Sequence, residues 1–223
     1  MCWTFKGHSF PKEVILQAVY FKLRFSLSYR DVEELLSIRG IRVDHATIQR
    51  WVYKFTPLIE VVLKKRRKLV GNSWRMDETY IKVKGEWMYL YRAVDKEGKT
   101  VDFLLTRRRS KLAAHKFLLK AISNNGCPKV VSIDKSGANK EAIRTYNNRS
   151  LKKIRIRQCK YLNNGVEGDH RFIKWRIQNM LGFKSFESAS RTLVGIEIVR
   201  MIKKEQVTFP RCTYFKTFCS MAA

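Results

Sequence analysis

The stretch from residue 73 to residue 91 limits the fold more than any other part of the chain, because it predicts two strands joined by a tight turn. One carboxylate, Asp77, falls in the middle of the first strand among apolar and aromatic neighbours. Side chains alternate across a strand, so Asp77 shares a face with Thr79, and Glu78 lies on the other face. A charge in a half-buried strand is costly unless something pairs with it. The sequence therefore predicts that Asp77 has a partner that offsets its charge.

The rest of the second half predicts a mixed sheet. Five strands are expected in all, at residues 74–83, 86–95, 100–106, 128–134 and 152–158. Helices are expected between and after the later strands, at residues 111–123, 138–146, 166–180 and 188–203. Three antiparallel strands followed by alternating helices and strands indicate an α/β fold with helices covering the sheet.

The N-terminal part predicts three helices. The first covers residues 11–25, the second runs from Ser28 to Gly40, and the third follows Asp44. Helix, short glycine-containing turn, helix is the helix-turn-helix pattern, whose later helix enters the major groove of DNA. A plain three-helix bundle would give the same pattern. The exposed candidates for DNA contact are His45, Thr47, Gln49, Arg50 and Lys54, and the core candidates are Ile48, Trp51, Val52 and Phe55.

Charge favours a nucleic-acid partner. The 223 residues include 46 Lys and Arg against 19 Asp and Glu, a formal net charge of +27. The five cysteines form no CxxC pair, which argues for a reducing compartment and against a structural zinc site. No signal peptide or membrane span is expected, so we predict a cytoplasmic protein without a membrane partner or a small-molecule substrate.

Three acids stand in specific settings. Asp77 is mid-strand, Asp134 ends a predicted strand, and Glu167 lies at the start of a predicted helix. Converging carboxylates repel one another, and a divalent cation relieves that repulsion. Oxygen ligands suit Mg²⁺ or Mn²⁺, and two such ions can drive phosphoryl transfer. The alternative is three unrelated solvated carboxylates.

Basic residues follow the last of these acids. Arg171 and Lys174 stand four and seven residues after Glu167, on the same helix face, where they could hold a DNA phosphate. Ordinary surface charges would give the same spacing in so basic a chain. Glu78 and Asp169 are rival acids that point away from Asp77 and Glu167.

Several segments resemble the small DDE insertion-sequence transposases of the IS-six type, in collinear order from about residue 5 to residue 206: FKGHSF, FSLSYRDVEELLSIRGIRVDHATIQRWV, WRMDETYIKVKGEWMYLYRAVDKEG, VVSIDKSGAN, KYLNNGVEGDHRFIKWR and MLGFKSFESASRTLVGIEIVRMIKK. The resemblance implies an RNase H-like core whose catalytic, metal-binding acids are Asp77, Asp134 and Glu167, with Lys174 as the basic residue that follows. It also implies Mg²⁺-dependent strand transfer at terminal inverted repeats, replicative in outcome through cointegrates. The enzyme would be a homo-oligomer on double-stranded DNA, associated with a bacterial nucleoid.

The expected domains are a helix-turn-helix at residues 1–63, a basic linker at 64–73, the catalytic core at 74–206 and a divergent tail at 207–223. Three residues depart from the family pattern, namely Gly165, Gly168 and Trp175. Glycine loosens a helix, which bears on the placement of the nearby catalytic glutamate. Two alternatives therefore stay open: a metal-dependent nuclease on the same core, and a catalytically impaired DNA-binding remnant.

Overall fold

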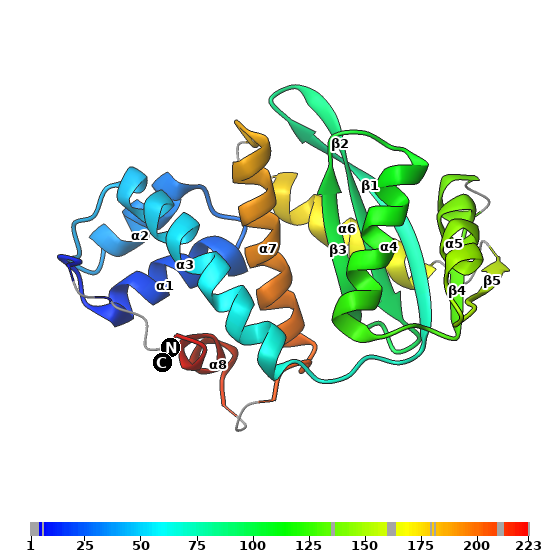
Figure 1. Ribbon diagram of the computed structural model, residues 1–223. Helices are drawn as coiled ribbons and strands as arrows, with labels where there is room; N and C mark the ends of the chain where they lie inside the picture. The colour runs from blue at the N-terminus through cyan, green and yellow to red at the C-terminus, as the bar shows by residue number, and fades with distance from the viewer. Residues whose placement is uncertain are drawn as a thin grey trace. The chain divides into compact units, whose positions relative to one another are not determined.

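The computed structural model describes residues 5, 7–134, 137–159, 164–178, 180, 182–208 and 212–222. The chain forms two compact units (Figure 1). We call residues 1–68 with 175–223 the helical unit, and residues 69–174 the sheet unit. No helix of the described residues is long and apolar enough to cross a membrane.

The helical unit contains five helices within the described residues: α1 (Lys12–Arg24), α2 (Tyr29–Ser37), α3 (His45–Arg66), α7 (Phe186–Lys203) and α8 (Tyr214–Ser220). Local signals set the ends of the second and third. Ser28 and Asp31 form a capping box at the start of α2, as expected. Gly40 has φ 75° in the turn, and the Asp44 carboxylate accepts from the first backbone N–H groups of α3. The helices and the glycine-containing turn lie where the sequence predicted them, and the helix-turn-helix assignment stays a prediction.

The third helix is longer than expected and absorbs part of the predicted basic linker. It continues past Pro57 to Arg66. Pro57 lacks an N–H, but Ile59 and Leu63 are buried beyond it, and their burial holds the helix together. The backbone N–H of Lys68 then donates to the carbonyl of Gln206. Residues 64–68 are thus a helix end and a fixed connection within the helical unit.

Helix α7 lies in the helical unit, so the predicted catalytic range 74–206 takes in residues of both units. It packs against α1, α3 and α8, and its buried side chains surround the helix on most sides. Gly195 makes this packing possible, because a Cβ there would lie 2.3 Å from Cδ2 of Leu23 on α1. The C-terminal tail joins the same core: Phe218 of α8 is fully buried and its ring packs against Tyr20.

The sheet unit is built on five strands within the described residues: β1 (Ser73–Val83), β2 (Glu86–Asp95), β3 (Thr100–Thr106), β4 (Val130–Ile133) and β5 (Arg155–Gln158). The helices α4 (Lys111–Asn125), α5 (Gly137–Arg149) and α6 (Asn164–Gln178) accompany them, and the boundary with the helical unit falls within α6. The strand order is β3-β2-β1-β4-β5, with β1 antiparallel to β2 and parallel to β4. This is the mixed α/β sheet that the sequence predicted.

The two faces of the sheet are covered by different helices. On one face Trp74 and Met76 of β1 pack with Phe117 of α4 and Ile143 of α5. The opposite face carries Asp77 and Thr79 and is approached by α6. The alternation expected for β1 is therefore confirmed, and it separates Asp77 from the main apolar core.

Candidate active site

Asp77 and Asp134 lie on neighbouring strands. The parallel pairing of β1 with β4 sets Arg75 opposite Ser132. Continuing the same register two residues further brings Asp134, just past the end of β4, opposite Asp77. The charge of Asp134 is one of the influences that raise the pKa of Asp77, which agrees with this proximity. Two of the three predicted acids therefore meet at the sheet's centre.

The environment of Asp77 disfavours its charge. Its side chain is 22% exposed. Burial raises the pKa of Asp77 to about 7, and the negative charges of Glu78 and Asp134 add to that effect. A carboxylate held between an apolar sheet and another acid is stabilised by a cation, so this pair is suited to bind one.

His170 of α6 is the neighbour that the sequence reasoning missed. Its Nδ1 lies 3.7 Å from Oδ2 of Asp77, beyond hydrogen-bond distance. Burial, with the charges of Arg92 and Lys174, lowers the pKa of His170 to about 3. The imidazole is therefore neutral at pH 7 and gives Asp77 no positive partner. Its position three residues after Glu167, one helical turn on, was the available signal.

A buried ion pair holds α6 against the sheet. The guanidinium of Arg92, on β2, donates to Oδ2 of Asp169 over 2.8 Å from Nη2 and 3.2 Å from Nε. It also donates to the Thr100 hydroxyl over 3.0 Å. The two side chains of the pair are 0% and 7% exposed. Asp169, considered as a rival acid, thus forms an ion pair with the sheet.

Glu78, the other rival acid, is held on the opposite face. It forms a salt bridge with Arg109 and accepts a 2.9 Å hydrogen bond from the amide of Asn139 on α5. Its side chain is only 5% exposed. Partners of this kind give Glu78 a structural role, and it does not share the face of Asp77.

The third acid and the basic residues lie on the surface of α6. Glu167 is in the first turn, and Arg171 and Lys174 follow it, all exposed. Among the residues that the structure describes, no three His, Cys, Asp or Glu side chains stand close enough to hold a metal ion together. The structure thus brings Asp77 and Asp134 together and leaves Glu167 outside their immediate cluster. The role of Glu167 stays a prediction.

The glycine beside Glu167 makes a direct test of how firmly α6 is formed. A Cβ at Gly168 would meet nothing within 4 Å, and its φ is not in the left-handed region. Gly168→Ala should therefore raise the free energy of unfolding by about 0.5–1 kcal/mol, because alanine loses less backbone entropy in a helix. Urea unfolding followed by circular dichroism measures this. The matched control is Gly195→Ala, which should destabilise by about 1–3 kcal/mol through overpacking against Leu23. Destabilisation by both would contradict this account of α6.

The expected DNA-contacting residues lie along α3. Arg50 and Lys54 are exposed, and the Lys54 amine lies 2.8 Å from Nε2 of His8. The Thr47 hydroxyl donates to the capping carboxylate of Asp44, and the Gln49 amide donates to the Tyr53 hydroxyl over 3.1 Å. The four residues expected in the core of this helix are buried, namely Ile48, Trp51, Val52 and Phe55. The contacts with DNA remain a prediction.

Comparison with known proteins gives the class to which this sheet and its acids belong. The family model described as "DDE domain" matches residues 71–206. The transposase for insertion sequence-like element IS431mec of Staphylococcus aureus is 40% identical over 206 residues, which are 90% of this chain and 89% of the relative. The transposase for insertion sequence element IS257 in transposon Tn4003, also from Staphylococcus aureus, matches to the same extent.

Retroviral integrases are among the similar solved structures. The simian T-cell lymphotropic virus intasome in complex with PP2A regulatory subunit B56 gamma has a TM-score of 0.45 at 18% identity, over 69% of this chain and 56% of that one. The catalytic core domain of BIV integrase has a TM-score of 0.44 at 14% identity, over 67% of this chain and 95% of that one.

The residues that match the DDE domain include the five strands of the sheet unit, which have an RNase H-like order, and α7 of the helical unit. The chain belongs to the family of DDE insertion-sequence transposases of the IS-six type, as its segments indicated. It is an enzyme that acts on DNA.

Proposed function

We propose that this protein cleaves DNA at the terminal inverted repeats of an insertion sequence and transfers the ends to target DNA. One observation carries the proposal beyond family membership. Asp77 and Asp134 lie on adjacent strands of a DDE core, and the pKa of Asp77 is raised to about 7. Such a pair is costly to the fold and is explained by a cation that it holds.

The donor set fits a divalent metal. Asp77 in the middle of β1 and Asp134 just past β4 offer hard oxygen ligands, and Glu167, on α6 outside that pair, is the proposed third ligand. Mg²⁺ is the proposed ion, with Mn²⁺ as its substitute. When bound, the metal lowers the pKa of the attacking hydroxyl and neutralises charge on the phosphate. No side-chain general base is then required.

The other residues of α6 position the DNA. Arg171 and Lys174 are exposed on the face that carries Glu167, so they can bind phosphates beside the acids. His170 is buried and neutral beside Asp77, so it does not compete with a metal ion for the carboxylate. The attacking group is water for the first cut and a DNA 3′-hydroxyl for strand transfer.

The helical unit recognises the element's ends. Thr47, Gln49, Arg50 and Lys54 of α3 are the residues proposed to contact DNA, since the later helix of a helix-turn-helix enters the major groove. The enzyme works as a homo-oligomer, because two element ends and a target must be held at once. We place it in the bacterial cytoplasm, next to the nucleoid.

The test is strand transfer on a labelled duplex that carries the inverted repeat flanking the gene, with Mg²⁺ or Mn²⁺, beside Asp134→Asn. The native protein should join ends, and the variant should bind equally well with joining reduced by about 10³-fold or more. Cutting without joining would identify a nuclease. Binding without any metal-dependent cutting would identify a DNA-binding remnant.

A further inference from the structure

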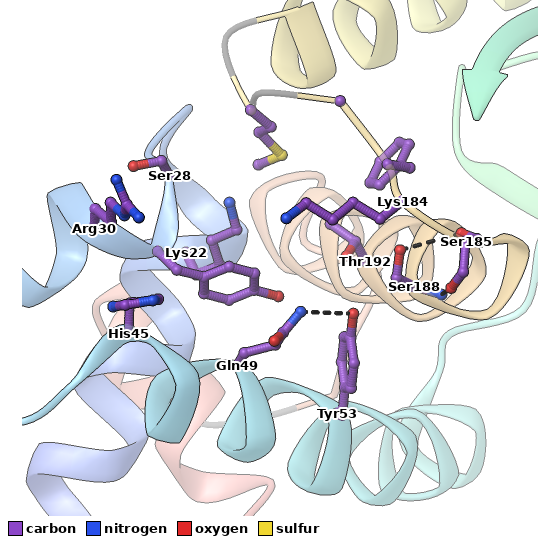
Figure 2. A pocket seen from close by; sticks show the side chains of 14 residues that line it. Lys22, Ser28, Arg30, His45, Gln49, Tyr53, Lys184, Ser185, Ser188 and Thr192 are labelled. Carbon is purple, nitrogen blue, oxygen red and sulfur yellow. Dashed lines mark hydrogen bonds between the residues drawn. The ribbon is translucent and has the colours of Figure 1, made fainter. Parts of the chain in front are cut away.

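The helical unit contains a cavity of about 560 Å³ that the transposition chemistry does not use (Figure 2). Its lining comes from the starts of α2, α3 and α7, from Lys22 near the end of α1 and from the segment before α7. The residues that line it are Lys22, Ser28, Tyr29, Arg30, His45, Gln49, Tyr53, Met180, Gly182, Phe183, Lys184, Ser185, Ser188 and Thr192. Its volume is in the range of sites that hold nucleotide-sized molecules.

Positive charge gathers along the lining of this cavity. Lys22, Arg30 and Lys184 line it, and none of the described lining residues is an Asp or a Glu. Figure 2 shows the amines of Lys22 and Lys184 turned toward the same space. The N-terminus of α7, which the neutral Ser185 caps, adds positive potential. The cavity is therefore suited to an anion.

Lys22 is the strongest single observation. Its side chain is almost fully buried, 3% exposed as a residue, and its amine donates to the carbonyl of Leu27 over 2.6 Å. Burial and the nearby Arg176 guanidinium lower the pKa of Lys22 to about 8, which the Asp31 carboxylate partly offsets. The direct partners of this ammonium are the Leu27 carbonyl and the Tyr29 ring, whose centre lies 4.4 Å away. An anionic ligand in the cavity would give the buried charge a counter-charge.

The remaining lining suits the flat face and polar edge of a base. Tyr29, Tyr53 and Phe183 supply aromatic surface, and bases stack on such rings whatever their sequence. The Gln49 amide, held by the Tyr53 hydroxyl, and the Ser185 and Ser188 hydroxyls supply hydrogen-bonding groups at the wall (Figure 2). A phosphate alone would need none of these aromatic rings.

The cavity also lies beside the helix that is proposed to read DNA. His45, Gln49 and Tyr53 form one stripe of α3 at four-residue spacing, and they line the cavity. Arg50 and Lys54 lie on the exposed stripe next to it. A nucleotide that leaves a duplex bound along α3 would therefore have only a short path to the cavity.

We propose that this cavity receives one nucleotide swung out of the bound inverted repeat, with its phosphate against Lys22 and Lys184 and its base among the aromatic rings. The inference rests on the proposed function, because it needs DNA bound by the helical unit. The site would stabilise an unpaired base near the element's end, which gives the enzyme a means to recognise that position beyond contacts in the groove.

The experiment places 2-aminopurine, in turn, at each position of the inverted-repeat duplex and follows its fluorescence when the full-length protein binds. We expect a several-fold rise at one position, because fluorescence increases when the base leaves the stack. Lys184→Gln should weaken binding and lower the slope of log affinity against log salt by about 1. The matched control Lys65→Gln removes an exposed lysine of the same unit that does not line the cavity.

A second variant tests the cavity itself. Ser188→Leu fills it without a change in charge, and it should abolish the fluorescence rise while urea unfolding confirms that the protein still folds. No rise at any position on DNA that the native protein binds would overturn the proposal, as would a rise that Ser188→Leu leaves unchanged. A lower salt slope for Lys184→Gln without any rise in fluorescence would mean that Lys184 contacts only a backbone phosphate of the duplex. This result would also overturn the proposal.

The catalytic proposal is tested separately by Asp134→Asn. That variant should keep the fluorescence rise while it loses strand transfer, since Asp134 lies in the sheet unit and the cavity in the helical unit. Strand transfer by native protein without extrusion would overturn only the cavity's role. Failure of the native protein to bind the inverted repeat would overturn both proposals.

Discussion

Asp77→Asn is expected to abolish strand transfer and, at the same time, to stabilise the metal-free protein at pH 8. The loss of activity should reach about 10³-fold or more, because an amide is a weak ligand for Mg²⁺ and cannot share the charge of the metal. The gain in stability follows from the buried position of the carboxylate, whose pKa is raised to about 7. Opposite signs for the two effects are the mark of a functional residue that the fold tolerates at a cost.

The gain in stability of Asp77→Asn depends on pH. An unfolded aspartate has a pKa of about 3.9. Between about pH 4 and pH 7 the Asp77 carboxyl therefore keeps its proton in the folded protein and has lost it in the unfolded chain. The stability of the native protein therefore falls as the pH rises through this window. Asparagine carries no such proton, so Asp77→Asn should gain about 2–4 kcal/mol over the native protein at pH 8 and nothing at pH 3.5. Urea unfolding in EDTA at both pH values measures the difference.

The neighbouring carboxylate provides the control. Glu78→Gln changes the next residue in the same way, but Glu78 has Arg109 and Asn139 as partners. We expect the free energy of unfolding of this variant to fall by about 1–3 kcal/mol at pH 8. Arg109 loses its counter-charge, and an amide must replace a carboxylate that accepts hydrogen bonds from both Arg109 and Asn139. Equal stabilisation by both variants would mean that burial near Asp77 is not the cause.

Local signals in the sequence predicted most of the elements. Ser28, Asp44 and the Lys84–Gly85 turn each fix the ends of a helix or hairpin through contacts within a few residues. Lys84 and Gly85 both have positive φ, 50° and 86°, as a two-residue hairpin turn requires. The register between Asp77 and Asp134 also follows once two parallel strands are recognised.

Non-local packing could not be predicted in the same way. The place of α7 beside α1 depends on Gly195 fitting against Leu23, which lies far earlier in the chain. The continuation of α3 past Pro57 depends on buried contacts of Ile59 and Leu63. The spacing of His170 from Glu167 places both on one side of α6, but the contact of His170 with Asp77 follows only once that helix is placed on the sheet. These features require tertiary contacts that no window of the sequence contains.

The buried ion pair of Arg92 and Asp169 should be costly to break. Arg92→Met removes the cation and leaves the Asp169 carboxylate buried without it. We expect the free energy of unfolding to fall by about 3–5 kcal/mol, a large share of the ~5–15 kcal/mol that stabilises a typical domain. Urea unfolding monitored by circular dichroism at pH 7 measures the loss. Lys99→Met is the matched control, because it breaks the exposed pair with Glu97 and should cost under about 1 kcal/mol.

The double variant Arg92→Met with Asp169→Leu separates the pair's net worth from the cost of a stranded charge. Apolar replacements that fill the space should restore most of the stability, since both desolvation costs disappear. Strand transfer should nevertheless stay reduced, because Asp169 attaches α6 to β2 and α6 carries Glu167, Arg171 and Lys174. If the double variant recovered full activity with its stability, the ion pair would serve only the fold. Stability without activity would instead show that this pair sets the position of α6 over the acids of the sheet.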